Sequence, residues 1–111
     1  MKKIRVYFVG KNPKNTKKIC LREICSDDLG ATWTYGLLGS ADEGRGKSYA
    51  VMPGSGINAV VLPAPENKYE LRVYFTYDDQ ESLAVAWMPD DNDHKGDWNL
   101  APNLYSVNKP W

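Results

Sequence analysis

The chain has 111 residues, with 14 Lys and Arg against 14 Asp and Glu and a pI near 6.6. Because the formal net charge is zero, no long-range field favours nucleic acid or an anionic membrane as a partner. No apolar run approaches the ~20 residues of a membrane span, and the residues after Met1 form no signal-peptide core. We expect a globular protein that inserts in no membrane and is either cytoplasmic or released without a signal peptide.

Short segments rich in β-branched and aromatic residues predict an all-β fold. Aromatic residues make up 12% of the chain, beside nine glycines and seven prolines, and helical periodicity is hard to find. Gly, Pro, Asn and Asp separate the apolar segments, as turn residues do between strands. The expected strands are residues 4–9, 18–25, 32–37, 57–62, 70–77, 83–88 and 97–100.

The two cysteines are expected to be free thiols. Cys20 and Cys25 lie five residues apart in one extended segment, which separates their Cα atoms by about 16 Å. A disulfide needs a Cα separation below about 7 Å. A disulfide framework is therefore not expected.

The sequence contains an internal repeat. The segment IRVYF at 4–8 recurs as LRVYF at 71–75. In both copies a second strand follows, then an acidic and glycine-containing turn, and then Trp33 or Trp98. We interpret the chain as one domain, 1–111, built from two units at about 1–40 and 57–103.

Units of this kind favour a β-propeller. A few short antiparallel strands cannot bury both faces of a sheet, so such repeats stack radially as blades of about four strands. Two blades cannot close a ring, and we therefore expect a homo-oligomer. The first unit has no counterpart of the strand at 57–62, and the segment 104–107 of a neighbouring copy is a candidate to supply it.

No motif indicates an enzyme, a metal site or a cofactor. The single histidine, His94, lies in an acidic loop, and the chain has neither a Gly-x-Ser-x-Gly motif nor Cys and His at metal-ligand spacing. Asp90, Asp91 and Asp93 are more typical of a turn than of a catalytic carboxylate pair or a calcium loop. We expect a non-enzymatic protein that needs no metal ion.

Two arginines in the middle of apolar strands require partners. Arg5 and Arg72 interrupt strands in which an unpaired charge is costly. Glu23 is likewise flanked by apolar residues on the next strand, so an Arg5–Glu23 pair is expected. The pair is open to two interpretations, a buried ion pair that fixes strand register and a clamp for a ligand. In the second unit Ala84 is expected at the position that corresponds to Glu23.

The tryptophans also have two interpretations. In a small β protein Trp is core material more often than not. An Arg, an acid and nearby indole rings are nevertheless the groups that a pyranose site needs, since the charged groups bond hydroxyls and the ring covers the apolar face. The four tryptophans are Trp33, Trp87, Trp98 and Trp111.

Four short motifs occur in this chain in the order found in a known family. They are IRVY at 4–7, LREIC at 21–25, the glycine turn before Trp33, and LRVY at 71–74. In these motifs, which extend over most of the chain, it resembles the fungal fucose-specific lectin family, including its short two-blade bacterial members. The resemblance implies a six-bladed propeller that binds L-fucose and fucosylated glycans between blades, completed by trimerisation of the two-blade chains.

The resemblance also implies the site residues. The first site would use Arg5, Glu23, the backbone near Leu37, and Trp87 with Trp98 from the second blade. The alternative is a structural or protein-interaction propeller without sugar binding.

A second site would combine Arg72 with Ala84 in place of the acid, and with Ser26 and Trp33 in place of two tryptophans. Because two of its four expected side chains are missing, we expect it not to bind.

Overall fold

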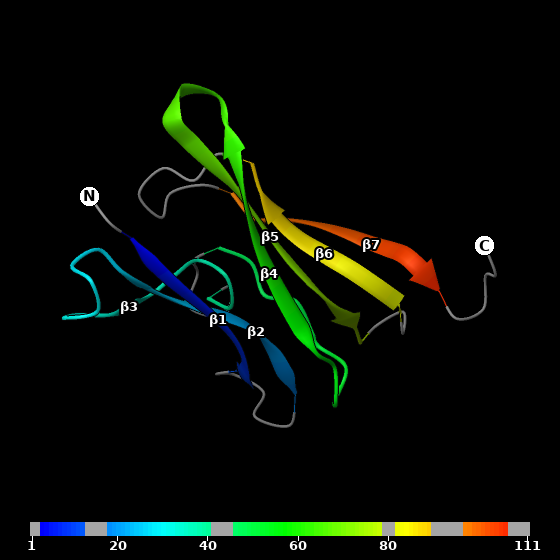
Figure 1. The fold of residues 1–111 in the computed structure, drawn as a ribbon. Helices are drawn as coiled ribbons and strands as arrows, with labels where there is room; N and C mark the ends of the chain where they lie inside the picture. Colours follow the sequence, from blue (N-terminus) through cyan, green and yellow to red (C-terminus); the bar gives the residue numbers. More distant parts are fainter. Residues whose placement is uncertain (1–2, 13–17, 41–45, 79–81, 90–96, 107–111) are drawn as a thin grey trace.

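The structure is a computed structural model that describes residues 3–12, 18–40, 46–78, 82–89 and 97–106. Within these residues the protein is all-β, with two antiparallel sheets of three and four strands and no α-helix (Figure 1). Each sheet is a meander, because strands that follow one another in the chain are neighbours. The predicted all-β class is confirmed. No helix in this part of the chain is long and apolar enough to cross a membrane.

The first sheet is built around one long hairpin. Its strands are β1 (Ile4–Lys11), β2 (Ile19–Ser26) and β3 (Thr34–Tyr35). β1 pairs with β2 over its whole length, from Ile4 opposite Ser26 to Lys11 opposite Ile19. β3 is much shorter than the predicted strand at 32–37, since it pairs with β2 only through Thr34 and Tyr35.

The second sheet has one strand more. Its strands are β4 (Ile57–Ala64), β5 (Lys68–Tyr77), β6 (Ser82–Met88) and β7 (Asn99–Ser106), with a 3₁₀ turn η2 (Pro65–Asn67) between β4 and β5. β4 and β7 are longer than predicted and run through Pro63 and Pro102. Both strands lie at an edge of the sheet, where a proline removes no ladder hydrogen bond that a neighbour needs.

The proposed role of the segment 104–107 as a strand donated to another copy is not supported. Residues up to Ser106 belong to β7, and Tyr105 and Ser106 pair with Leu83 and Ser82 of β6 in the same chain. Their pairing with β6 therefore places them in the second sheet of their own chain. Residue 107 lies outside the described residues.

The segment between the sheets connects their backbones. The amide of Val51 donates to Ile19 O of β2 at 3.1 Å, and that of Met52 donates to Thr76 O of β5 at 2.9 Å. Isolated bridges join the same segment to Cys20 and Tyr77. This part of the long linker is thus ordered by main-chain hydrogen bonds to both sheets.

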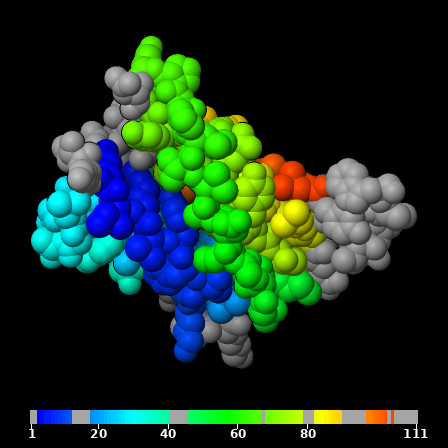
Figure 2. Space-filling model, in the orientation of Figure 1, coloured from blue at the N-terminus to red at the C-terminus, as the bar shows by residue number. Residues whose placement is uncertain are grey.

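Each sheet has an inner face, which meets the other sheet, and an outer face, because side chains alternate along a strand. Val9 opposite Leu21 lies on the first inner face, and Val73 opposite Ala86 on the second. Figure 2 shows β1 and β4 side by side where the two sheets meet, and these strands are in contact. The shared core consists of Leu21, Leu38, Val51, Leu71, Val73, Phe75, Ala84, Ala86, Met88 and Trp98. Each large side chain buried here contributes about 1.5–3 kcal/mol.

Candidate functional site

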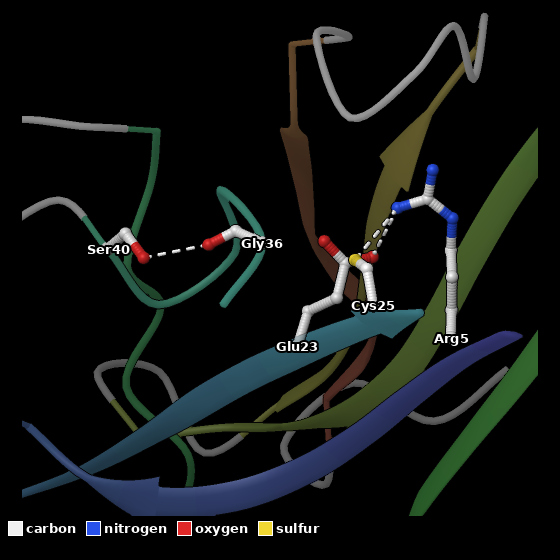
Figure 3. A network of polar contacts seen from close by, with 5 residues as sticks. All are labelled: Arg5, Glu23, Cys25, Gly36 and Ser40. Carbon is white, nitrogen blue, oxygen red and sulfur yellow. Dashed lines mark hydrogen bonds and ion pairs between the residues drawn. The ribbon is translucent and has the colours of Figure 1, made fainter. Parts of the chain in front are cut away.

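Arg5 and Glu23 form the expected pair on the inner face of the first sheet. Arg5 Nη1 lies 3.2 Å from Glu23 Oε2 and also donates a hydrogen bond to Cys25 Sγ at 3.3 Å. Figure 3 shows the two side chains rising from neighbouring strands, with the second terminal nitrogen of Arg5 pointing away from the carboxylate. The side chains are only 7% and 1% exposed. The charged pair is therefore almost completely removed from water.

The Glu23 carboxylate lies against the backbone of Gly36. A Cβ atom at Gly36 would overlap Glu23 Oε1, because it would lie far closer than any non-bonded contact allows. The Gly36 amide donates to Glu23 O at 2.9 Å, and Ser40 Oγ donates to Gly36 O at 2.7 Å (Figure 3). These bonds hold Gly36 in place, so only a residue without a side chain leaves room for the acid.

Tyr7 connects this pair to the second sheet. It lies directly opposite Glu23 in the β1–β2 register, and its ring meets Trp98 edge to face, with centroids 5.9 Å apart and planes at 79°. Burial raises the pKa of the Tyr7 hydroxyl well above its ordinary value, and the negative charge of Glu23 adds to the rise. The cation, the acid, a phenol and an indole therefore meet at one junction between the sheets.

Leu37 follows Gly36 and so approaches the same junction. Its carbonyl oxygen already accepts the amides of Lys47 at 3.1 Å and Ser40 at 3.4 Å. The Leu37 side chain packs against the core. The backbone near Leu37 is thus beside Glu23, as expected, but its carbonyl is engaged in holding the loop.

The two tryptophans assigned to this site lie on opposite faces of the second sheet. Trp98 is 2% exposed and belongs to the core, beside Tyr7. Trp87 lies opposite Arg72 and Asn99 in the register, on the outer face. The expectation that both indoles reach Arg5 from one blade is therefore wrong within a single chain. Successive residues along β6 and β7 point to alternate faces, and Trp98 and Trp87 fall on different ones.

The second arginine has a different partner from the one expected. Arg72 lies opposite Trp87, whereas Ala84 lies opposite Phe75 in the core, so Val85 is the residue that corresponds in register to Glu23. The interpretation of Ala84 as the counterpart of Glu23 is therefore wrong.

Arg72 instead pairs with Glu70 of its own strand, through Nη2 at 2.9 Å and Nε at 3.0 Å. Hydrogen bonds to Tyr74 and to Glu70 raise the pKa of Arg72. This ion pair lies on the outer face, 40% and 22% exposed. It is therefore far more accessible than the Arg5–Glu23 pair.

The other two residues assigned to the second site, Ser26 and Trp33, belong to the first sheet and its turn, whereas Arg72 lies in β5 of the second sheet. Ser26 is the buried last residue of β2, and its hydroxyl donates to Asp28 Oδ1 at 2.8 Å and accepts the Gly30 amide at 2.7 Å in the turn that follows. Trp33 is 41% exposed and lies beside Gly30. The described contacts assign Ser26 to turn formation and leave the Trp33 ring accessible.

Several candidates lie outside the described residues. These are Asp90, Asp91, Asp93, His94 and Trp111. Within the described ranges, no group of three or more His, Cys, Asp or Glu residues is arranged to hold a metal ion. Cys20 and Cys25 are both buried and are not joined in a disulfide, as predicted from their spacing.

Comparison of the chain with protein-family models, with curated proteins and with solved structures finds no match. The functional argument therefore depends on the residues and their geometry.

Sequence reasoning missed three contributors to this chemistry. The role of Gly36 could be recognised only in the structure, because nothing in the sequence places it against Glu23. Tyr7 was visible as part of the repeated strand motif but carried no assigned role. Glu70 could have been found from the alternation of strand residues, which places it on the same face as Arg72 two positions later.

Proposed function

We propose that the protein is a non-enzymatic lectin that binds L-fucose and fucosylated glycans. The observation that carries the proposal is the Arg5–Glu23 pair, held 3.2 Å apart on one sheet face at a junction with an aromatic side chain of the other sheet. A guanidinium only donates hydrogen bonds and a carboxylate only accepts them. Neighbouring sugar hydroxyls can therefore accept a hydrogen bond from Arg5 and donate one to Glu23. The choice of L-fucose as the sugar comes from the motif resemblance to the fucose-specific lectins.

The junction is suited to a small ligand with one polar and one apolar face. Arg5 and Glu23 would provide the polar side of the site. The Trp98 ring of the second sheet, which contacts Tyr7, would provide the apolar side. Since Glu23 is 1% exposed, binding requires a local opening of the side chains around the pair. The free and bound states then differ in the packing between the two sheets.

We also propose that copies of the chain assemble into a six-bladed propeller, with three copies of two blades each. The two sheets stack face to face, as neighbouring blades do. Their outer faces carry exposed apolar side chains, namely Val6 and Tyr35 on the first sheet and Leu83 on the second. A ring in which the outer face of one copy covers that of the next would bury these side chains.

Assembly would also determine the strength of binding to glycan surfaces. Each hydrogen bond to a charged group contributes about 1.5–3 kcal/mol before desolvation and ordering costs, so a single site is weak. Several sites on one ring gain by avidity, because later binding events are intramolecular. Multivalent presentation is therefore part of the proposed function.

One observation favours a second candidate, a structural or protein-interaction propeller without sugar binding. The Arg5–Glu23 pair is nearly inaccessible to water, as a pair that only fixes strand register would be. In that case the pair would couple β1 to β2 and bind nothing.

A glycan array combined with native mass spectrometry separates the two candidates. The lectin should give hits that share a terminal fucose and should have the mass of a trimer. An array without fucose-containing hits would favour the interaction protein, and a stable monomer would overturn the ring.

A further inference from the structure

Two side chains of β2 accept hydrogen bonds from the same nitrogen of Arg5. Arg5 Nη1 lies 3.2 Å from Glu23 Oε2 and 3.3 Å from Cys25 Sγ (Figure 3). This nitrogen carries two hydrogens, one for each acceptor. Glu23 and Cys25 are two residues apart in the strand, so both side chains project from the inner face of the sheet. The guanidinium is therefore held at two points by one strand.

The strand register places the two acceptors differently with respect to Arg5. Cys25 lies directly opposite Arg5, whereas Glu23 lies opposite Tyr7 and is reached diagonally. A guanidinium with a single acceptor can still turn about that one bond. A second acceptor at the facing position removes this rotation and keeps Nη1 beside the carboxylate. Cys25 is 2% exposed, so water has little access to this contact.

The second repeat lacks both acceptors. Arg72 lies opposite Trp87, whose indole nitrogen can only donate a hydrogen bond, and Val85 stands at the position of Glu23. Arg72 bonds Glu70 of its own strand instead. The arginine of the repeated motif thus reaches across to the next strand in the repeat that has the facing thiol and the acid.

We propose that Cys25 is a positioning residue of the sugar site, which holds the Arg5 guanidinium beside Glu23 before the sugar arrives. The inference rests on the proposed lectin function and adds a residue that determines its affinity. Arg5 and Glu23 have to bond neighbouring hydroxyls of one sugar. A guanidinium that is already in place loses less conformational freedom on binding. The thiol acts through Arg5 and needs no contact with the sugar.

Three substitutions of Cys25 separate its hydrogen bond from its packing. Cys25→Ala removes the acceptor, Cys25→Val removes it but fills the space, and Cys25→Ser keeps an acceptor. In titration calorimetry with methyl α-L-fucoside, the alanine and valine variants should bind about three- to tenfold more weakly than the wild type, the cost of immobilising one long side chain. Cys25→Ser should bind within about twofold of the wild type, because its hydroxyl accepts a hydrogen bond as the thiol does.

The order of the serine and valine variants is the decisive result. A buried thiol that only packs behaves as a small hydrophobic group and is better replaced by valine, whereas a thiol that holds Arg5 is better replaced by serine. Circular dichroism checks that each variant is folded. If Cys25→Ala is not folded, the valine and serine variants still make the comparison.

Cys20→Ala is the matched control. Cys20 belongs to the same strand and is 1% exposed, but it lies opposite Gly10 and its side chain points to the other face of the sheet. This variant should bind methyl α-L-fucoside as the wild type does.

Two results would overturn the inference while leaving the proposed function in place. One is wild-type affinity in a folded Cys25→Val, and the other is a Cys25→Ser that binds as weakly as Cys25→Val. A wild-type protein that binds no fucoside would overturn the proposed function, and this inference with it.

Discussion

Replacing Gly36 by alanine should disrupt the Arg5–Glu23 pair without changing either charged residue. The new Cβ would overlap Glu23 Oε1, and real Cβ contacts are not shorter than 3.0 Å, so the carboxylate must move by about 1 Å or more. Gly36 itself cannot easily retreat, because its amide bonds Glu23 O and its carbonyl accepts from Ser40. The displaced acid leaves Arg5 as a nearly buried charge without its 3.2 Å partner.

The cost follows from the burial of the pair. Breaking a buried ion pair costs about 3–5 kcal/mol when one partner is removed, and about 2–4 kcal/mol is expected for a displaced partner. For a domain of this size each kcal/mol lowers the melting temperature by about 4–8 °C. Urea denaturation and retention on a fucose column measure stability and binding on the same sample.

A matched control is available in Gly56→Ala. Nothing lies within 4 Å of the Cβ position at Gly56, and its φ is not in the left-handed region. This variant should have wild-type stability and retention. If Gly36→Ala matched the control in both assays, the tight contact between Gly36 and Glu23 and its proposed role in the site would be refuted.

Three further predictions concern the core, metal ions and pH. Trp98→Ala should lower the free energy of unfolding by about 3–5 kcal/mol in chemical denaturation, because Trp98 is 2% exposed and fills the core between the sheets. EDTA should leave glycan binding unchanged on an array. A loss of binding in EDTA that added Ca²⁺ restores would contradict this prediction. Hydrogen bonds from the Thr32 side chain and amide and from Ser26 lower the pKa of Asp28 to about 2, below its ordinary 3.8. Its contribution to stability should therefore be complete above about pH 4 and be lost as the pH falls towards 2. Asp28→Asn should make the unfolding midpoint less dependent on pH between about pH 4 and pH 2. A pH dependence equal to that of the wild type would contradict the role given to Asp28.

The sequence was sufficient for the strands and for the first charged pair. Period-two alternation and turn residues locate six of the seven strands to within two residues at each end, whereas β7 continues six residues past its expected end at 100. Arg5 and Glu23 could be paired in advance, since charges within apolar strands of one hairpin must satisfy each other. The short β3 and the extensions of β4 and β7 depend on hydrogen bonds that no local pattern encodes.

The second unit shows where the pattern stops being informative. The turn between β5 and β6 is shorter than the turn between β1 and β2, and turn length sets strand register. A shift of one residue exchanges the faces, which is why Val85 and not Ala84 corresponds to Glu23 and why Trp87 leaves the first site. Neither position follows from a comparison of the two repeats as strings of residues.

Titration calorimetry of methyl α-L-fucoside tests the central claim most directly, with wild type, Arg5→Ala and Arg72→Ala measured side by side. The pair at Arg5 is placed at the sugar site, whereas Arg72 bonds Glu70 on the outer face. The account predicts saturable binding of about one sugar per chain in the wild type and in Arg72→Ala, and no detectable binding in a folded Arg5→Ala, because losing a charge-assisted contact costs about 2–5 kcal/mol in an already weak site. Absence of binding in the wild type, or retained binding in folded Arg5→Ala, would contradict it.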